Sequence, residues 1–265
     1  MPLLFWPGLQ ISAHVMLEES APALAALTRR WILAVSPPGW ETPQLAVGEY
    51  RPTALARLVV DLLDALELER AVYVGHSWGA SIGCHLAASA PARLDALVLL
   101  DAGYTDFQDR PGYEEMDLAA VTAISVEQAR DARWSSWEDC FEFFRPFVRT
   151  WRPALEERLR AGMREENGLI VPVVQPDVFA AASYGVMVEP PSATLESLEK
   201  LEVPILLVVA SDTISTEHGR RALERFRSAV PDAEVVEVDS GHDLLADAPE
   251  DTLAVLDRWA QRSVA

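Results

Sequence analysis

The chain has 265 residues, half of them hydrophobic, and a formal net charge of −19 at neutral pH. This length is enough for one domain with a sizeable core, and the acidic surface disfavours nucleic acid and anionic membranes as partners. No apolar run approaches the ~20 residues that cross a bilayer, and the N-terminus lacks the pattern of a secretory signal. We therefore expect a soluble, cytoplasmic protein.

Apolar strands alternate with amphipathic helices over most of the chain. Residues 3–6 (LLFW) and 31–36 (WILAVS) are short apolar runs that end at Pro and Gly, as buried strands often do. Residues 12–30 and 52–66 carry apolar side chains at helical spacing. Further strands are expected at 71–75, 94–103, 203–211 and 233–241, and further helices at 77–90, 217–229 and 249–261. The alternation predicts an α/β fold with a mostly parallel central sheet.

Residues 104–201 interrupt this alternation. They are rich in Trp, Phe and Arg, are mostly helical by pattern, and contain no convincing buried strand before Pro204. We interpret them as a helical lid inserted into a core formed by residues 1–103 and 202–265. The lid is expected to cover the carboxyl edge of the sheet, where open α/β proteins bind their ligands.

A G-x-S-x-G motif follows the strand at 71–75 and opens the next helix. Its members are Gly75, His76, Ser77, Trp78 and Gly79. In such a motif the serine lies on a strained turn between strand and helix, which we call the elbow. The glycines remove side chains that would collide there. The preceding strand and the following helix are the context that the motif requires. We therefore predict that Ser77 is a catalytic nucleophile.

A serine hydroxyl needs a general base at neutral pH. Of the five histidines, His242 lies between the last predicted strand and the last helix. Sites built on a G-x-S-x-G motif hold their base there, and their three residues follow one another along the chain in the order Ser, acid, His. His242 is therefore the predicted base. The acid that orients it has two candidates. Asp212, which ends the strand at 203–211, is preferred, and Asp101, which ends the preceding core strand, is the alternative.

Two backbone N–H groups are needed to stabilise the oxyanion that forms when a serine attacks a carbonyl. One is expected from Trp78, which directly follows the nucleophile. The other is expected from the loop after residues 3–6. There Pro7 and Gly8 place Leu9 at the donor position, since proline has no N–H to donate.

The substrate pocket is expected to be lined by rings from the elbow region and from the lid: Trp6, Trp40, His76, Trp137, Phe141 and Phe144. Most lid aromatics are expected to pack within the lid, while some face Ser77. Such a pocket suits a mid-sized apolar or aromatic substrate. Arg145, Arg149 and Arg152 form either a carboxylate-binding group or a solvated helix face, and the solvated face is preferred.

Six segments resemble the α/β-hydrolase superfamily: LLFWPGLQ, SPPGW, GHSWG, LVLLDAG, PILLVVASD and SGHDLL. The resemblance spans nearly the whole chain and implies the α/β-hydrolase fold. More narrowly, PLLFWPGLQISAHV is similar to the opening of the cofactor-independent quinolone dioxygenases. Those enzymes also have Pro-Gly before the oxyanion donor, and they place their acid at the position of Asp101.

The sequence departs from the superfamily at its start, because the two antiparallel strands that usually precede LLFW are missing. Without that hairpin, the stretch from Trp31 to Ser36 becomes an exposed sheet edge. Exposed apolar edges pair with other strands or need covering. We therefore expect a homodimer, or a covering segment, at this edge. The alternative is a chain shortened by a misplaced start.

Three functions are consistent with these residues. The preferred one is a serine hydrolase that cleaves an ester, lactone or thioester of a small molecule through an acyl-enzyme. The second is a cofactor-independent dioxygenase or lyase acting on a quinolone-like substrate, with His242 as general base. The third is a small-molecule receptor without turnover, which an intact Ser77 and His242 disfavour. No metal-ligand spacing or phosphate-binding glycine loop stands out, so no cofactor is expected.

Overall fold

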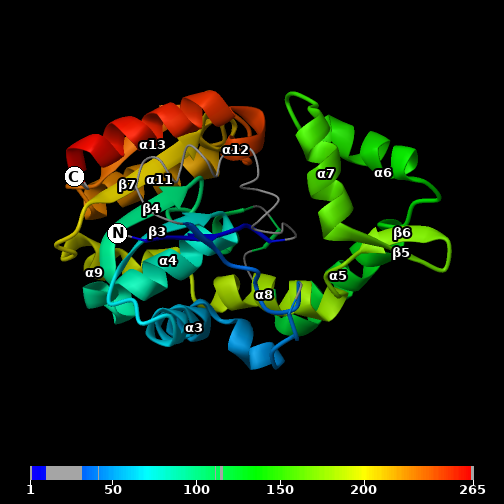
Figure 1. The fold of residues 1–265 in the computed structure, drawn as a ribbon, viewed down its shortest axis with the longest axis horizontal. Coiled ribbons are helices and arrows are strands. Elements are labelled where there is room, and N and C mark those ends of the chain that lie inside the picture. The colour runs from blue at the N-terminus through cyan, green and yellow to red at the C-terminus, as the bar shows by residue number, and fades with distance from the viewer. Residues whose placement is uncertain (1, 10–31, 41, 111, 114–115, 264–265) are drawn as a thin grey trace.

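The computed structural model describes residues 2–9, 32–40, 42–110, 112–113 and 116–263. Within these residues, six strands form one parallel sheet in the order β2-β1-β3-β4-β7-β8 (Figure 1). The strands are β1 (Leu3–Trp6), β2 (Ile32–Ala34), β3 (Ala71–His76), β4 (Leu94–Leu100), β7 (Ile205–Ala210) and β8 (Glu234–Val238). The predicted mostly parallel sheet is confirmed. The helix expected at 12–30 lies outside the described residues.

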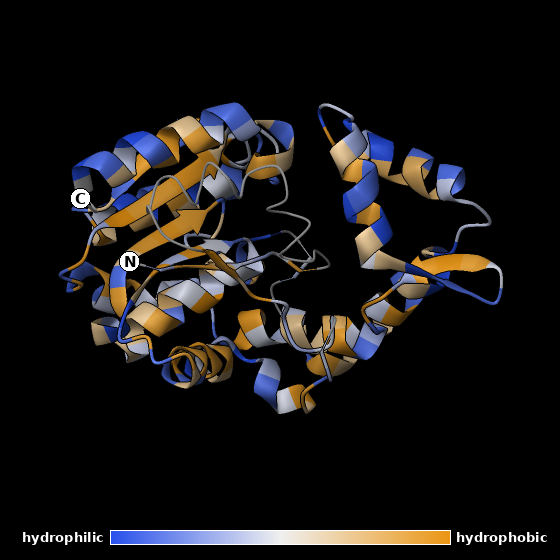
Figure 2. Ribbon diagram, viewed as in Figure 1, coloured by the Kyte–Doolittle hydropathy of each residue, from blue (hydrophilic) through white to orange (hydrophobic). Residues whose placement is uncertain are grey.

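Alternate side chains of each strand face two separate apolar layers. On β1, Leu4 and Trp6 belong to one layer and Leu3 and Phe5 to the other, as the two-residue period of a strand requires. The first layer is packed by α3 (Pro52–Ala65), α4 (Trp78–Ser89) and α11 (Glu217–Ala229), and the second by α12 (Leu244–Asp247) and α13 (Pro249–Ser263). Figure 2 shows the apolar strands between these helices. Burial on both faces explains why the strands read as continuous apolar runs.

Helix starts coincide with prolines or capping side chains. Pro52, Pro153 and Pro176 open their helices, because a proline at the first position gives up an N–H that has no partner there. Thr216 instead caps α11, where its hydroxyl accepts the N–H of Gly219. Short 3-10 helices connect these elements at Val47–Tyr50, Pro91–Arg93, Phe107–Asp109, Arg145–Phe147 and Pro191–Thr194. Local sequence therefore sets where most elements begin.

The segment between β4 and β7 is largely helical. It contains α5 (Leu118–Asp131), α6 (Trp137–Phe144), α7 (Pro153–Gly162), α8 (Pro176–Val188) and α9 (Leu195–Glu199). In Figure 1, α6, α7 and the β5–β6 hairpin stand apart from the sheet, whereas α8 lies near α3. We call residues 137–172, which contain these outer elements, the cap.

The hairpin within the cap was not predicted. Its strands β5 (Met163–Glu166) and β6 (Leu169–Pro172) pair antiparallel, so the expectation of no strand before Pro204 was wrong. Asn167 and Gly168 form the turn, with φ of 53° and 75°. An Asn-Gly pair is a strong hairpin signal because both residues adopt positive φ readily, but the surrounding Glu and Arg residues also suit a helix.

Strand β2 lies at one end of the sheet as it is described and pairs with β1. Ile32 and Leu33 are half-buried and Ala34 is exposed. Trp31 lies outside the described residues. A homodimer at this edge stays a prediction.

Candidate active site

The turn between β3 and α4 holds Ser77 in a strained conformation. Its φ of 54° and ψ of −114° are values that a residue with a side chain rarely adopts. A Cβ on Gly75 would lie 2.4 Å from the backbone of Gly79, and a Cβ on Gly79 would lie 2.2 Å from the carbonyl oxygen of Trp6. Only glycine fits at either position, so β1, β3 and α4 approach closely enough to hold the turn.

The structure brings together a serine, a histidine and an aspartate from three separate loops. His242 Nε2 lies 2.8 Å from Ser77 Oγ, and His242 Nδ1 lies 2.7 Å from Asp101 Oδ2. An ionised carboxylate can only accept hydrogen bonds, so His242 Nδ1 carries the ring proton and donates it to Asp101. His242 Nε2 is then unprotonated, and its lone pair faces the Ser77 hydroxyl. This arrangement suits removal of the proton from Ser77.

Asp101 is fixed by four donors at the end of β4. Its Oδ1 accepts the N–H of Ala210 at 2.8 Å and faces the Tyr104 hydroxyl at 3.4 Å. Its Oδ2 accepts hydrogen bonds from the Thr213 hydroxyl, at 2.6 Å, and from the Nδ1–H of His242. The side chain has no exposed surface, and burying a carboxylate without such hydrogen-bond partners is costly.

Asp212, the preferred acid, makes no hydrogen bond with His242. Its carboxylate is held by Arg149, whose Nε and Nη2 lie 3.0 and 2.5 Å from the two oxygens. The same guanidinium donates to Asp239 at 2.6 Å and to Ser211 at 3.1 Å. Hydrogen bonding to Arg149 lowers the pKa of Asp212. The carboxylate beside His242 is Asp101, the alternative, while Asp212, in the short helix α10 (Ser211–Ser215) that follows β7, pairs with Arg149 of the cap.

The loop that carries His242 is held by its neighbours on three sides. The His76 Nε2–H donates to the carbonyl oxygen of His242 at 2.9 Å, and Asp247 Oδ2 accepts the N–H of Gly241 at 3.1 Å. Asp243 pairs with Arg158 of the cap at 2.9 Å. These supports were not anticipated from the sequence, because their partners lie far apart along the chain.

The loop after β1 lies directly beside the nucleophile. A Cβ on Gly8 would lie 3.1 Å from both Ser77 Cβ and His76 Nδ1. Leu9 and Trp78 line the same cavity as Ser77, and Trp78 is the first residue of α4, where helix N–H groups point outward and favour negative charge. The roles of Leu9 and Trp78 as oxyanion donors stay predictions.

Three residues expected in the pocket are buried instead. Trp6 and Trp40 pack against the Trp78 ring, with centroids 5.9 and 5.3 Å away, and they are absent from the lining of the cavity at Ser77. His76 is also buried, and burial lowers its pKa. These three rings pack around the elbow on its buried side. Large rings so close to the core strands are usually buried by packing rather than exposed in a pocket.

Leu9 lines two separate cavities. One, of about 140 Å³, contains Ser77 and His242 together with Thr105, Phe107 and Arg110. The other, of about 230 Å³, lies beneath the cap and is mainly apolar; it is lined by Leu9, Phe144, Phe147, Val148, Trp151, Leu155, Arg158, Leu159, Gly162, Met163 and Asp243. Of the predicted pocket aromatics from the lid, Phe144 alone appears in these two linings.

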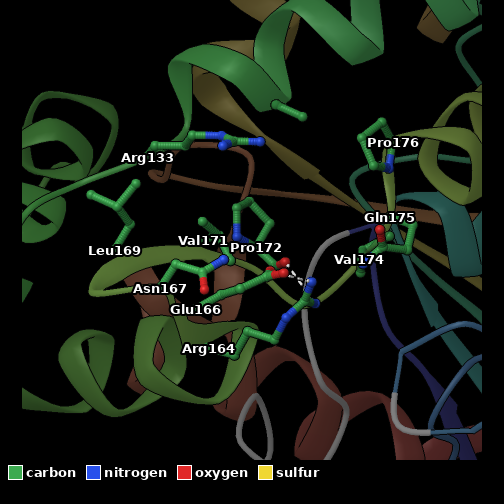
Figure 3. Close-up of a pocket in the computed structure, with 11 residues that line it drawn as sticks. Arg133, Arg164, Glu166, Asn167, Leu169, Val171, Pro172, Val174, Gln175 and Pro176 are labelled. Carbon is green, nitrogen blue, oxygen red and sulfur yellow. Dashed lines mark hydrogen bonds and ion pairs between the residues drawn. The ribbon is translucent and has the colours of Figure 1, made fainter.

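Trp137 and Phe141 pack within the cap. Their rings lie 5.9 Å apart, and the Arg160 guanidinium stacks over both. A third cavity, of about 240 Å³, lies at the cap hairpin and is lined by Arg133 and Arg164 among others (Figure 3). Arg164 there pairs with Glu166 at 3.0 Å. This cavity contains neither Ser77 nor His242.

Within the described part of the chain, no group of three or more His, Cys, Asp or Glu residues is arranged to hold a metal ion. Among the same residues, no helix combines the length and the apolar character needed to span a bilayer.

Comparison with known proteins gives consistent matches. The sequence model of the Alpha/beta hydrolase family matches residues 3–255. Esterase YbfF of Escherichia coli (strain K12) is 36% identical over 77 residues, which cover 29% of this chain and 30% of that protein. The chain therefore aligns with less than a third of that relative.

Solved structures share the fold over almost the whole chain. The crystal structure of E-2-(acetamidomethylene)succinate hydrolase matches with a TM-score of 0.76 at 20% identity, covering 98% of this chain and 91% of that one. The thioesterase domain from the curacin biosynthetic pathway matches with a TM-score of 0.71 at 16% identity, covering 99% and 91%. At such identities the likeness extends to the fold alone.

Proposed function

The chain belongs to the alpha/beta hydrolase family, and we propose that it is a serine hydrolase that cleaves an ester, lactone or thioester of a mid-sized apolar or aromatic molecule. The observation that carries the proposal is the continuous hydrogen-bonded chain from Ser77 through His242 to Asp101, with distances of 2.8 and 2.7 Å. A nucleophile, a base and an orienting carboxylate at these distances are what acyl transfer requires.

In the proposed reaction, Ser77 Oγ attacks the substrate carbonyl while His242 Nε2 takes the hydroxyl proton. Asp101 stabilises the resulting imidazolium, and the N–H groups of Leu9 and Trp78 hold the oxyanion. The leaving alcohol or thiol departs with the proton from His242 and leaves an acyl-serine. A water molecule then attacks the acyl carbon, gives its proton to His242, and releases the acid as Ser77 regains its hydrogen.

The cavity beneath the cap supports an apolar substrate. Phe144, Phe147 and Trp151 line it with several aliphatic side chains, and Leu9 lines both this cavity and the one that contains Ser77. Burying an apolar group there is favourable by roughly 25 cal/mol per Å² of surface removed from water.

The test is labelling with a fluorophosphonate probe, followed by mass spectrometry of the modified peptide. We expect an adduct on Ser77 that is lost in Ser77→Ala and strongly reduced in His242→Ala. The exposed Ser228, whose hydroxyl donates to the Glu224 carbonyl, provides the control variant Ser228→Ala, which should label like the natural chain. An unlabelled Ser77 in folded protein would contradict the proposal.

One observation favours a second candidate, a cofactor-independent dioxygenase or lyase of heteroaromatic substrates. His242 pairs with Asp101, at the end of β4, which is where the quinolone dioxygenases keep their acid. In that reaction His242 removes a substrate hydroxyl proton, and Ser77 only helps to bind. Oxygen consumption on a 3-hydroxyquinolone that persists in Ser77→Ala would support it. A lack of oxygen consumption, together with ester hydrolysis, would exclude it.

A further inference from the structure

The smaller cavity carries a single arginine. Among the described residues that line it, Arg110 is the only arginine or lysine. Arg110 is exposed, and its guanidinium carbon lies 4.9 Å from the centre of the Phe107 ring, which lines the same cavity. A guanidinium is attracted to an aromatic face, which restricts where it lies. The cavity that contains the nucleophile therefore also presents a fixed positive charge.

The two acidic side chains that line this cavity already have partners other than Arg110. Asp106 accepts the N–H of Ser192 at 3.1 Å and pairs with Arg225 at 3.1 Å, and Asp101 is held by His242 and three further donors. Among the described residues, no carboxylate lies within ion-pair distance of the Arg110 guanidinium. Among these residues, Arg110 is a cation without such a partner at the cavity of the nucleophile, in a chain with 41 acidic and 22 basic residues, and its guanidinium can therefore bind an anionic ligand.

Arg145 and Arg149, two of the three arginines that the sequence offers for carboxylate binding, have other partners. Arg149 is committed to Asp212 and Asp239, and Arg145 pairs with Glu142 and stacks over Trp151. Neither lines the cavity of Ser77.

We propose that Arg110 binds a carboxylate on the substrate, so that the enzyme acts on esters with a carboxylate at one end and an apolar group at the other. This rests on the proposed hydrolase function. A planar guanidinium binds a carboxylate through two parallel hydrogen bonds, and the small cavity of about 140 Å³ accommodates a short acidic group. The apolar cavity of about 230 Å³ beneath the cap receives the other half.

The test compares kcat/KM for matched esters with and without a carboxylate, at one ionic strength, because salt screens this contact. The acyl-side pair is 4-nitrophenyl hydrogen succinate and 4-nitrophenyl pentanoate, and the alcohol-side pair is 4-acetoxybenzoate and its methyl ester. In Arg110→Gln, the ratio of kcat/KM for the acidic ester to that for the neutral one should fall about tenfold in one pair, mainly through KM. That pair identifies the half that carries the carboxylate.

Two further variants make the test specific. Arg110→Lys keeps the charge without the planar fork and should recover part of the ratio. Arg133→Gln removes an exposed arginine from the separate cavity at the cap hairpin and should leave both ratios unchanged. Unchanged ratios in folded Arg110→Gln, or an equal fall in Arg133→Gln, would overturn the proposal. Neutral esters that are still cleaved in Ser77→Ala would instead overturn the hydrolase function itself.

Discussion

Replacing Asp101 by asparagine tests the orientation of the base. Asparagine tolerates the positive φ of 47° at this position, so the backbone should be kept. The new amide must turn its oxygen toward the N–H of Ala210, which Oδ1 now accepts at 2.8 Å. Its NH₂ group then faces His242 Nδ1, which has to become an acceptor. The ring proton moves to Nε2, which lies 2.8 Å from Ser77 Oγ, and the histidine no longer removes the serine proton.

We expect Asp101→Asn to lower kcat by about 10⁴ through the wrong imidazole tautomer, which corresponds to about 5 kcal/mol of transition-state stabilisation. The matched control is Asp212→Asn. Its side chain is 56% exposed and pairs with Arg149, and exposed ion pairs contribute little, so kcat should stay within about threefold. The assay is hydrolysis of 4-nitrophenyl butyrate, with circular dichroism to check folding. Comparable losses in the two variants, or a larger loss in Asp212→Asn, would refute the reasoning.

Two further predictions concern the cap and a buried histidine. Arg149→Gln removes the contacts of the cap with Asp212 and Asp239, so limited proteolysis within the cap should accelerate and KM should rise more than kcat falls; unchanged proteolysis would contradict an anchoring role. Burial lowers the pKa of His76 from 6.5, so protonating His76 is less favourable in the folded chain than in the unfolded chain. The free energy of unfolding should therefore fall as the pH drops below 6.5, by up to about 1.4 kcal/mol at pH 5.5. In His76→Asn, the urea unfolding free energy should fall less between pH 7.5 and pH 5.5, and an equal fall would be the contrary result.

Much of the fold was predictable because it depends on local patterns. The strands of the parallel sheet are apolar runs that end at turn residues, and they lie close to the predicted ranges. The elbow was predictable for a steric reason, since Gly75 and Gly79 leave no space for a side chain. The cap hairpin was missed although Asn167 and Gly168 signal its turn, because the flanking Arg and Glu residues also suit a helix.

The sequence by itself determined the nucleophile candidate and the base candidate, because Ser77 and His242 each stand in a recognisable local context. It did not distinguish Asp101 from Asp212, since both follow strands that are neighbours in the sheet. Only the tertiary structure places Asp101 against His242, 141 residues away, and brings Arg149 of the cap to Asp212, 63 residues away. Contacts over such separations depend on how strands and cap pack, and no local pattern encodes them.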